Sequence, residues 1–268
     1  ITTVHGSDVF ALKGRVLESF KRFTLKNSNA VTVNSSVTEQ SVRRIYPEIN
    51  ILKRIPMGVT LQNGEIFHSE VEKVRDQYRR EDGPLLVFVG RLVQEKGAEY
   101  LLKAVKLLIS EIPNITLMLV GDGQDRKGLE LLSFDYGIEG HVYFTGWVQP
   151  EDVIIYMAAG DIFIGPSCTG TDGTVEAQGL TFLEAMVAGT PVIASNIGGI
   201  VDAVRNNETG ILIDEKNPKQ IVDAVKKLNG DTELVERLTS SASEVVKKKF
   251  TRQSSAQAFD KLFCEIIS

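Results

Sequence analysis

The sequence lacks the features that would assign it to a membrane, an oxidising compartment or a nucleic acid. Its only two cysteines, Cys168 and Cys264, form no Cys-x-x-Cys pair, so we expect no zinc site and no disulfide framework, and a reducing cytosol fits best. No apolar run approaches the ~20 residues that span a bilayer, and the first residues lack the regions of a signal peptide. The formal charge of −5 argues against a nucleic-acid partner.

What the sequence does contain is enough apolar material for well-packed cores. Hydrophobic residues make up 43% of the 268 residues and charged residues 24%, which suits one large or two modest globular domains. The chain begins with Ile1 in a strand-like segment rather than with Met, so we expect a fragment of a longer protein.

Short apolar runs alternate with amphipathic stretches from residue 85 onward, a pattern typical of repeated βα units. The amphipathic segments 98–112 and 218–228 carry apolar residues at helical spacing. We therefore predict an α/β fold with a Rossmann-like, doubly wound parallel sheet. Its strands should begin near Leu85, Ile115, His141, Asp161, Thr190 and Ile211.

The first 60 residues repeat the alternation, with a helix expected from about Ser7 to Asn27. We assign residues 1–60 to the remnant of a first Rossmann-like domain and the polar, partly helical residues 61–84 to a linker. Residues 85–250 form the main domain, and residues 251–268 form a final amphipathic helix.

Two carboxylates flank one expected helix start in the segment from Pro166 to Ser195. Glu176 precedes Gly179 in a loop, and Glu184 follows in the first turns of a short helix. Carboxylates accept hydrogen bonds from vicinal hydroxyls, while the free N–H groups of a helix start bind anions. Sugar hydroxyls beside a phosphate satisfy both.

Two cations follow the strand expected at residues 85–89. Arg91 and Lys96 lie at its carboxyl end, where open α/β sheets bind ligands. Arg91 offers a planar fork of donors and Lys96 a mobile point charge, so both can hold a diphosphate. Weaker signals come from LVGDGQ at 119–124, whose glycines let backbone approach a nucleoside, and from FTGWV at 144–148, whose backbone can pair with a base edge.

These motifs together resemble the retaining glycosyltransferases of the family-four group (glycosyl transferases group 1), which have the two-Rossmann-domain architecture called GT-B. The matching pieces are GRLVQEKG, LVGDG, VYFTGWV, DIFIGPS, the pair Glu176 and Glu184, and LEAMVAGTPVIAS, in the family's order. The resemblance covers about 85–228, and VHGSD at 4–8 is similar to a first-domain histidine motif.

The resemblance implies a role for each matching residue. Arg91 and Lys96 would hold the diphosphate, Glu176 would contact the transferred sugar, Glu184 would accept from the ribose hydroxyls, and His5 would line the catalytic cleft. The remaining candidate donor-binding residues are Gly90, Gly121, Val148, Gly179, Leu180, Thr181 and Phe182, the last three through their backbone. We expect Arg91, Lys96, Glu176 and Glu184 to converge on one cleft.

Two departures from the family pattern concern the sugar. The usual Glu-Gly pair reads Glu176, Ala177, so a methyl group replaces a hydrogen where backbone runs close to the sugar. The preceding loop is longer than the commonest form, so Asp172 is a candidate for an added sugar contact. No carboxylate cluster has convincing metal spacing, so we predict neither a metal nor another cofactor.

The predicted reaction is transfer of a hexose from a nucleoside diphosphate sugar to an unidentified acceptor, lipid or polysaccharide among the candidates, with retention. Two alternatives stay open: a nucleotide-sugar epimerase of the same architecture, and a donor-binding fragment without activity of its own. We expect a cytoplasmic protein. Peripheral contact with the inner membrane surface through Lys247, Lys248 and Lys249 is an alternative to a solvated helix end.

Overall fold

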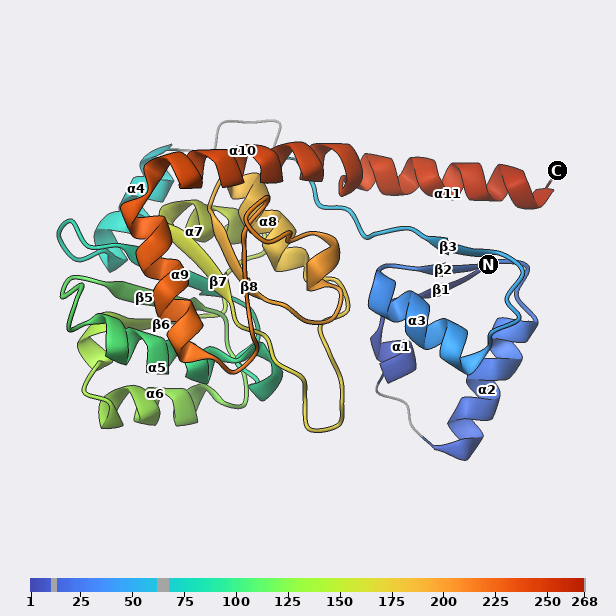
Figure 1. The fold of residues 1–268 in the computed structure, drawn as a ribbon, viewed down its shortest axis with the longest axis horizontal. Coiled ribbons are helices and arrows are strands. Elements are labelled where there is room, and N and C mark those ends of the chain that lie inside the picture. Colours follow the sequence, from blue (N-terminus) through green and yellow to red (C-terminus); the bar gives the residue numbers. More distant parts are fainter. Residues whose placement is uncertain (11–13, 62–67, 268) are drawn as a thin grey trace.

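The structure is a computed structural model that describes residues 1–10, 14–61 and 68–267. It contains a small parallel sheet built by the amino-terminal residues and a larger parallel sheet built by residues 85–213 (Figure 1). The predicted α/β class and the parallel sheets are confirmed.

The small sheet has the order β1-β2-β3, and both neighbouring pairs are parallel. Thr2 lies opposite Val31, and Val31 lies opposite Leu52. Three helices connect or follow its strands. The elements of this unit are β1 (Thr2–Val4), α1 (Ser7–Phe10), α2 (Arg15–Lys26), β2 (Val31–Val33), α3 (Ser36–Ile45) and β3 (Leu52–Arg54).

The single helix predicted from about Ser7 to Asn27 is wrong, because α1 ends at Phe10 and α2 begins at Arg15. Gly14 precedes α2 with a φ of 119°, a backbone conformation that residues with a side chain rarely adopt and that no α-helix contains. Residues 11–13 lie outside the described residues.

The large sheet has the order β6-β5-β4-β7-β8-β9, and all its pairs are parallel. Its strands are β4 (Leu85–Val89), β5 (Thr116–Val120), β6 (Val142–Gly146), β7 (Ile162–Gly165), β8 (Val192–Ser195) and β9 (Ile211–Ile213). Its helices are α4 (His68–Tyr78), η1 (Gln94–Lys96), α5 (Ala98–Leu108), α6 (Arg126–Asp135), η2 (Glu139–His141), α7 (Val153–Ala159), α8 (Leu180–Ala188), η3 (Ile200–Asp202), α9 (Pro218–Gly230) and α10 (Thr232–Lys249), and α11 (Arg252–Ile267) follows.

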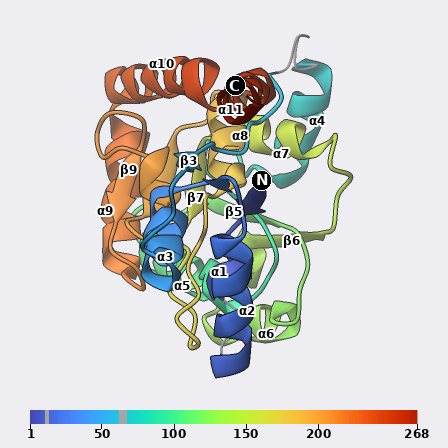
Figure 2. The same cartoon turned by 90° about the vertical axis from the view of Figure 1, so that its right-hand side faces the viewer.

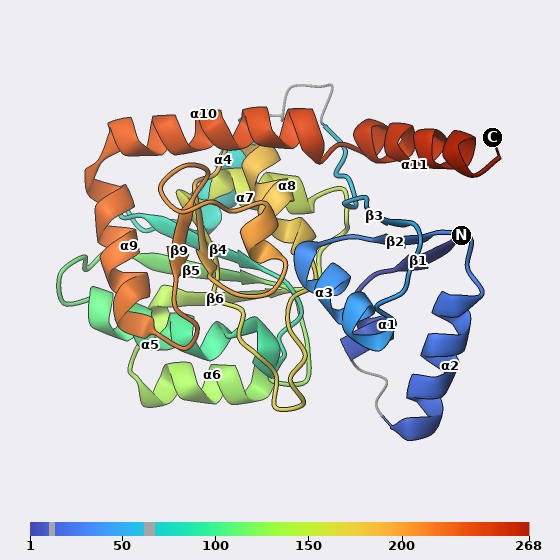
Figure 3. The same cartoon turned by 45° about the vertical axis from the view of Figure 1, so that its right-hand side comes forward.

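The large sheet is buried on both faces because its strands are apolar at successive positions. Along β4, Leu86 and Phe88 pack into a core with α5 and α9, whereas Leu85 and Val87 pack into a second core with α7 and α8. This alternation follows from the two-residue period of a strand. Accordingly, α8 and α10 lie above the sheet and α5 and α6 below it in Figure 3.

The chain passes from the small sheet to the large one near Val59 and returns near Thr251, and these two crossings lie side by side. Val59 forms a parallel bridge with Thr251, and its N–H donates to the carbonyl of Phe250 at 2.8 Å. Beyond this bridge, α11 returns over the small sheet, where Leu262 is buried with Ala30 and Ile55 (Figures 1 and 2). The final helix therefore covers the unit that the chain builds first.

Helix α4 belongs to the packing of the large sheet. Arg75 donates to the carbonyl of Ala159 at 3.0 Å and forms an ion pair with Asp161. The expected linker 61–84 thus includes a docked helix, and its residues 62–67 lie outside the described residues. The boundaries 1–60, 61–84, 85–250 and 251–268 stay predictions.

Asp161 is expected to be a stability determinant, because one oxygen of its carboxylate pairs with Arg75 and the other accepts from the N–H of Leu85 at 2.8 Å. Asp161→Ala leaves two partly buried donors, the Arg75 guanidinium and the Leu85 N–H, without their acceptor. It should therefore lower the free energy of unfolding by about 1–3 kcal/mol. Urea denaturation checks this, with Lys226→Ala in the exposed Glu111–Lys226 pair as control. Equal losses in the two variants would contradict the assignment.

Candidate functional site

The order of the large sheet reverses between β4 and β7. From β4 the chain adds β5 and then β6 on one side, and from β7 it adds β8 and then β9 on the other. Ligands of open α/β sheets bind outside the carboxyl ends of the strands at such a switch point. The segments that follow β4 and β7 are therefore the expected walls of a binding site.

The two segments are bound to each other. The N–H of Cys168, in the loop after β7, donates to the carbonyl of Glu95 at 2.8 Å. The thiol of Cys168 lies 3.3 Å from the carbonyl oxygen of Gln94. The same loop is held from β9, since Glu215 accepts from the N–H of Thr169 at 2.6 Å. These bonds fix η1 and the loop relative to each other.

Lys96 and Glu176 meet across the switch point. The ammonium of Lys96, at the end of η1, lies 2.5 Å from a carboxylate oxygen of Glu176, 80 residues later. Their side chains are 24% and 19% exposed, so the pair is partly desolvated yet open to a ligand. Two of the four residues expected in one cleft are thus in direct contact.

Arg91 lies in a hollow of about 190 Å³ next to the end of β4. Gly90, Gly121 and Val148, all predicted donor-binding residues, line the same hollow. The full lining is Val89, Gly90, Arg91, Val120, Gly121, Asp122, Trp147, Val148 and Val153. The hollow therefore brings the motifs after β4, β5 and β6 to one place.

A glycine is required at position 121 for the floor of this hollow. Gly121 has a φ of 134°, and a Cβ there would lie 2.0 Å from the carbonyl oxygen of Gly90. Its N–H donates to the carbonyl of Gly146 at 2.9 Å. The turns after β4, β5 and β6 can approach one another because no side chain stands between them.

The charges at the hollow have opposite signs. Arg91 supplies a cation, and Asp122 supplies a carboxylate next to the Arg126 guanidinium at 3.0 Å. A hydrogen bond from the N–H of Gly123, together with one from Arg126, lowers the pKa of Asp122 below its ordinary value. Asp122 is therefore ionised at neutral pH.

Trp147 was not among the predicted site residues, although its motif was. It is the only tryptophan of the chain, it lines the hollow, and it is 65% exposed. The sequence signal that could have identified it is a large aromatic residue directly after Gly146, at the end of a strand. Exposed aromatic faces stack on nucleobases.

The start of α8 lies beside Glu176. Gly179 precedes the helix, and Leu180 and Thr181 are its first two residues. The N–H of Phe182 donates to the carbonyl of Gly179 at 3.1 Å, so that group is already engaged. The ring of Phe182 is buried, with its centroid 5.6 Å from that of Phe163. The side chain of Phe182 thus stabilises the core beneath the helix start.

Glu184 lies in α8, one turn beyond this start. Burial raises the pKa of its carboxyl above the ordinary value, and the charge of Arg252 opposes this shift. In the described part of the chain, no hydrogen bond or ion pair joins Glu184 to Lys96 or Glu176. Convergence of all four predicted residues on one cleft stays a prediction.

His5 lies near the donor loop, which we define as residues 176–179, and Asp172 lies in the loop that precedes it. His5 is exposed, its N–H donates to Asp8 at 2.8 Å, and Gly6 beside it packs against Ala177. The carboxylate of Asp172 accepts from the N–H of Thr174 at 2.8 Å, within the preceding loop. His5 is thus near the loop that the sequence assigned to the sugar.

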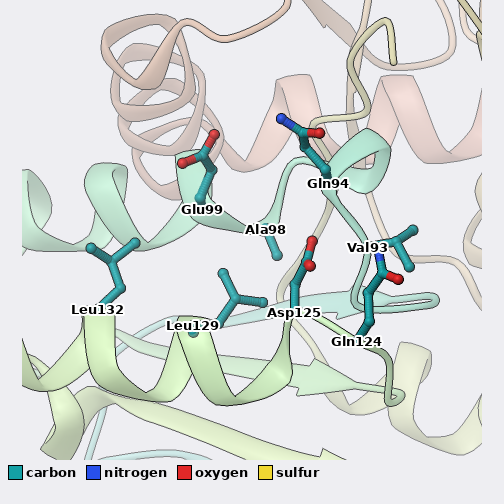
Figure 4. A pocket seen from close by; sticks show the side chains of 9 residues that line it. Val93, Gln94, Ala98, Glu99, Gln124, Asp125, Leu129 and Leu132 are labelled. Atoms are coloured by element: carbon teal, nitrogen blue, oxygen red, sulfur yellow. The ribbon is translucent and has the colours of Figure 1, made fainter. Parts of the chain in front are cut away.

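A larger hollow of about 500 Å³ lies between α5 and α6, beside the β4–α5 connection (Figure 4). Leu129, Leu132 and Asp125 point from α6 toward α5, and Val93 and Gln94 line the hollow at the connection. None of the predicted site residues lines it.

Comparisons with known proteins agree with the observed fold and with the family that the motifs resemble. A model of the family described as glycosyl transferases group 1 matches residues 70–245. The GDP-mannose-dependent alpha-(1-6)-phosphatidylinositol monomannoside mannosyltransferase of Mycobacterium tuberculosis is 31% identical over 229 residues, covering 85% of this chain and 60% of the relative. The 2-deoxystreptamine glucosyltransferase of Streptomyces kanamyceticus is 27% identical over 231 residues, covering 84% and 57%.

Among solved structures, Anabaena HepE in complex with UDP has a TM-score of 0.87 at 21% identity, covering 98% of this chain and 71% of HepE. The fold is thus that of the GT-B glycosyltransferases, as the resemblance implied. The chain belongs to the glycosyl transferases group 1 family. It spans about three fifths of the length of the curated relatives it matches.

The described residues contain neither a metal-binding cluster nor a membrane-spanning helix. Among the described residues, no group of three or more His, Cys, Asp or Glu side chains is arranged to hold a metal ion. Within the same residues, no helix has the length and apolar character needed to cross a bilayer. The absence of a required metal stays a prediction.

Glu184→Gln is expected to stabilise the chain at neutral pH. Because burial raises the folded-state pKa above the unfolded one, the folded state holds the proton more tightly, and ionised Glu184 opposes folding. This penalty is absent below the ordinary value near 4.5 and grows as pH rises through the folded-state pKa.

Urea denaturation of both proteins at pH 4 and pH 7.5 measures the effect, with Glu151→Gln at an exposed position as control. The Glu184 variant should gain stability only at pH 7.5. A loss at that pH would mean that the carboxylate has favourable contacts that outweigh its burial.

Proposed function

We propose that the protein containing this chain transfers a hexose from a nucleoside diphosphate sugar to an acceptor, with retention at the anomeric carbon. The observation that carries the proposal is the Lys96–Glu176 pair at the point where the sheet order reverses. A cation for a phosphate and a carboxylate for sugar hydroxyls lie there side by side, at the place where this fold binds ligands.

The reaction breaks the bond between the anomeric carbon and a diphosphate oxygen, and it forms a bond from that carbon to an acceptor oxygen, which loses its proton. Negative charge grows on the departing diphosphate. Arg91 and Lys96 are two cations of the β4–α5 connection, and the start of α8 adds N–H groups. Fixed positive groups at the leaving group lower the barrier.

The nucleoside is assigned to the hollow of Arg91. We propose that the base lies against Trp147, with the backbone of Val148 at its edge, and that Asp122 faces its polar groups. Glu176 would contact the sugar and Glu184 the ribose hydroxyls. The ion pair with Lys96 would orient Glu176 until the diphosphate shares the cation.

We propose only a class of acceptor and a general cellular location. One relative is named for a phosphatidylinositol mannoside and another for 2-deoxystreptamine, which supports saccharide or lipid acceptors without selecting one. We further propose that the protein is cytoplasmic, that it touches the inner membrane surface only peripherally, and that it needs no metal. A donor-binding fragment and an epimerase remain the alternatives.

Nucleotide binding should change the fluorescence of Trp147. Because it is the only tryptophan and it lines the hollow, the signal reports on that site alone. We expect UDP or GDP to quench the emission saturably, with N-acetyltryptophanamide as the control for light absorption by the nucleotide. If calorimetry detects binding but the fluorescence does not change, the base binds elsewhere. If neither signal appears with UDP, GDP or ADP, the donor site is not present in this chain.

Lys96→Ala in the full-length enzyme should reduce turnover more than tenfold. A lost contact to a developing oxyanion costs about 2.7–4 kcal/mol, and each 1.4 kcal/mol is a factor of ten. Lys103→Ala, in an exposed pair with Glu99 on α5, is the matched control. An unchanged rate in the Lys96 variant would exclude Lys96 from the mechanism.

Mass analysis of the products formed with donor alone and with acceptor extracts distinguishes transfer from epimerisation.

A further inference from the structure

Gln178 is a buried amide that joins the donor loop to the other unit of the chain. Its side chain is 3% exposed. Its carbonyl oxygen accepts from the N–H of Met57 at 2.9 Å, and its amide nitrogen donates to the carbonyl of Met57 at 2.7 Å. Both hydrogen-bonding groups of one residue's backbone are thus satisfied by a side chain 121 residues away.

Met57 lies in the segment where the chain passes from the small sheet to the large one. Before it, the carbonyl of Pro56 accepts from the hydroxyl of Ser255 at 2.6 Å. After it, Val59 pairs with Thr251. The partner of Gln178 is therefore anchored to the start of α11 and is a fixed point of the structure.

The donor loop is held on both of its sides. The carbonyl of Glu176 accepts from the N–H of Gly199 at 2.8 Å, within the large unit. On the opposite side, the methyl group of Ala177 touches Gly6, where an added Cβ would lie 2.4 Å away. Ala177, which departs from the family pattern, thus contacts the small unit, as its neighbour Gln178 does.

A second bond across the same interface lies close by. Asp202, in η3, accepts from the N–H of Ser36 at 2.6 Å, and so it satisfies a free donor at the first position of α3. Arg54 lies 3.8 Å from the other oxygen of this carboxylate. The interface is therefore polar and directional, and its geometry depends on individual hydrogen bonds.

We propose that Gln178 is a positioning residue for the sugar end of the donor, an inference that rests on the proposed function. Gln178 lies two residues after Glu176, whose carboxylate meets Lys96. By holding the backbone of Met57, it fixes the donor loop against the small unit and so fixes where Glu176 points. Arg91 and Trp147 line the nucleoside hollow, whose lining includes neither Gln178 nor Met57.

If Gln178 were merely structural, its loss would change the affinities for the nucleotide sugar and for the matching nucleoside diphosphate together. Loss of the Gln178 bonds should weaken binding of a nucleotide sugar, whose sugar meets Glu176. It should leave binding of the matching nucleoside diphosphate nearly unchanged. The expected loss for the nucleotide sugar is about tenfold, the effect of one misplaced hydrogen bond to a charged group.

The test compares Gln178→Leu with Gln220→Leu in the same 1–268 chain. Gln220 also makes two hydrogen bonds to one residue, at 2.6 and 2.8 Å to Asp214, and neither bond involves the donor loop. Calorimetric titration with UDP, UDP-glucose, GDP and GDP-mannose measures both affinities, and thermal melting shows whether each variant folds. Gln178→Glu, which keeps the acceptor for the N–H of Met57, is the second variant if Gln178→Leu does not fold.

We expect the Gln178 variant to lose affinity about tenfold for the nucleotide sugar and less than about twofold for the diphosphate, with no change in the Gln220 variant. Equal losses for both ligands, or no loss for either, would overturn the positioning role while leaving the donor site in place. Failure of the native chain to bind any of these four ligands or ADP would overturn the proposed function itself.

Discussion

The site depends on the contact between β4 and β7 in the middle of an all-parallel sheet. Because every strand of a parallel sheet ends at the same edge, the segments that follow them collect at that edge. Only at the β4–β7 boundary do those segments diverge to opposite sides, so that a ligand can enter between them. Lys96 comes from one side and Glu176 from the other. Their contact is thus a property of strand order, and either residue alone on its helix or loop would be an ordinary surface charge.

Much of the fold could be predicted from the sequence, since strands buried on both faces leave uninterrupted apolar runs such as 85–89 and 116–120. The break before α2 could not, because an amphipathic pattern continues across a glycine whose backbone conformation it does not reveal. At the site, Arg91 and Lys96 were identifiable from their place after a strand. The expectation that Glu176 lies near Lys96 came from the family resemblance, since local periodicity does not specify which strands become neighbours. Gln178 was missed because its partner Met57 lies 121 residues away in the chain, whereas Trp147 was missed although it directly follows Gly146 at the end of a strand.

The two units are coupled through the loop that also supplies the expected sugar ligand. Glu176, Ala177 and Gln178 each face a different neighbour: Lys96, Gly6 and Met57. A change in the arrangement of the small unit would therefore reach the donor through three consecutive residues. Directional hydrogen bonds at such an interface favour one arrangement over others more strongly than apolar packing does, because a shift of about 1 Å already weakens them. The departure from the family sequence at Ala177 thus concerns how the two units are arranged as much as the choice of sugar.

The return of α11 over the small sheet makes the amino-terminal unit discontinuous in sequence. Leu262 and its neighbours Phe259 and Ile266 cover Ala30 and Ile55, and Lys53 pairs with Glu265 at 3.0 Å. Residues 1–54 are synthesised before α11, so one face of their sheet lacks its cover until α11 has been made. A chain shortened before Arg252 would therefore expose an apolar surface that α11 buries.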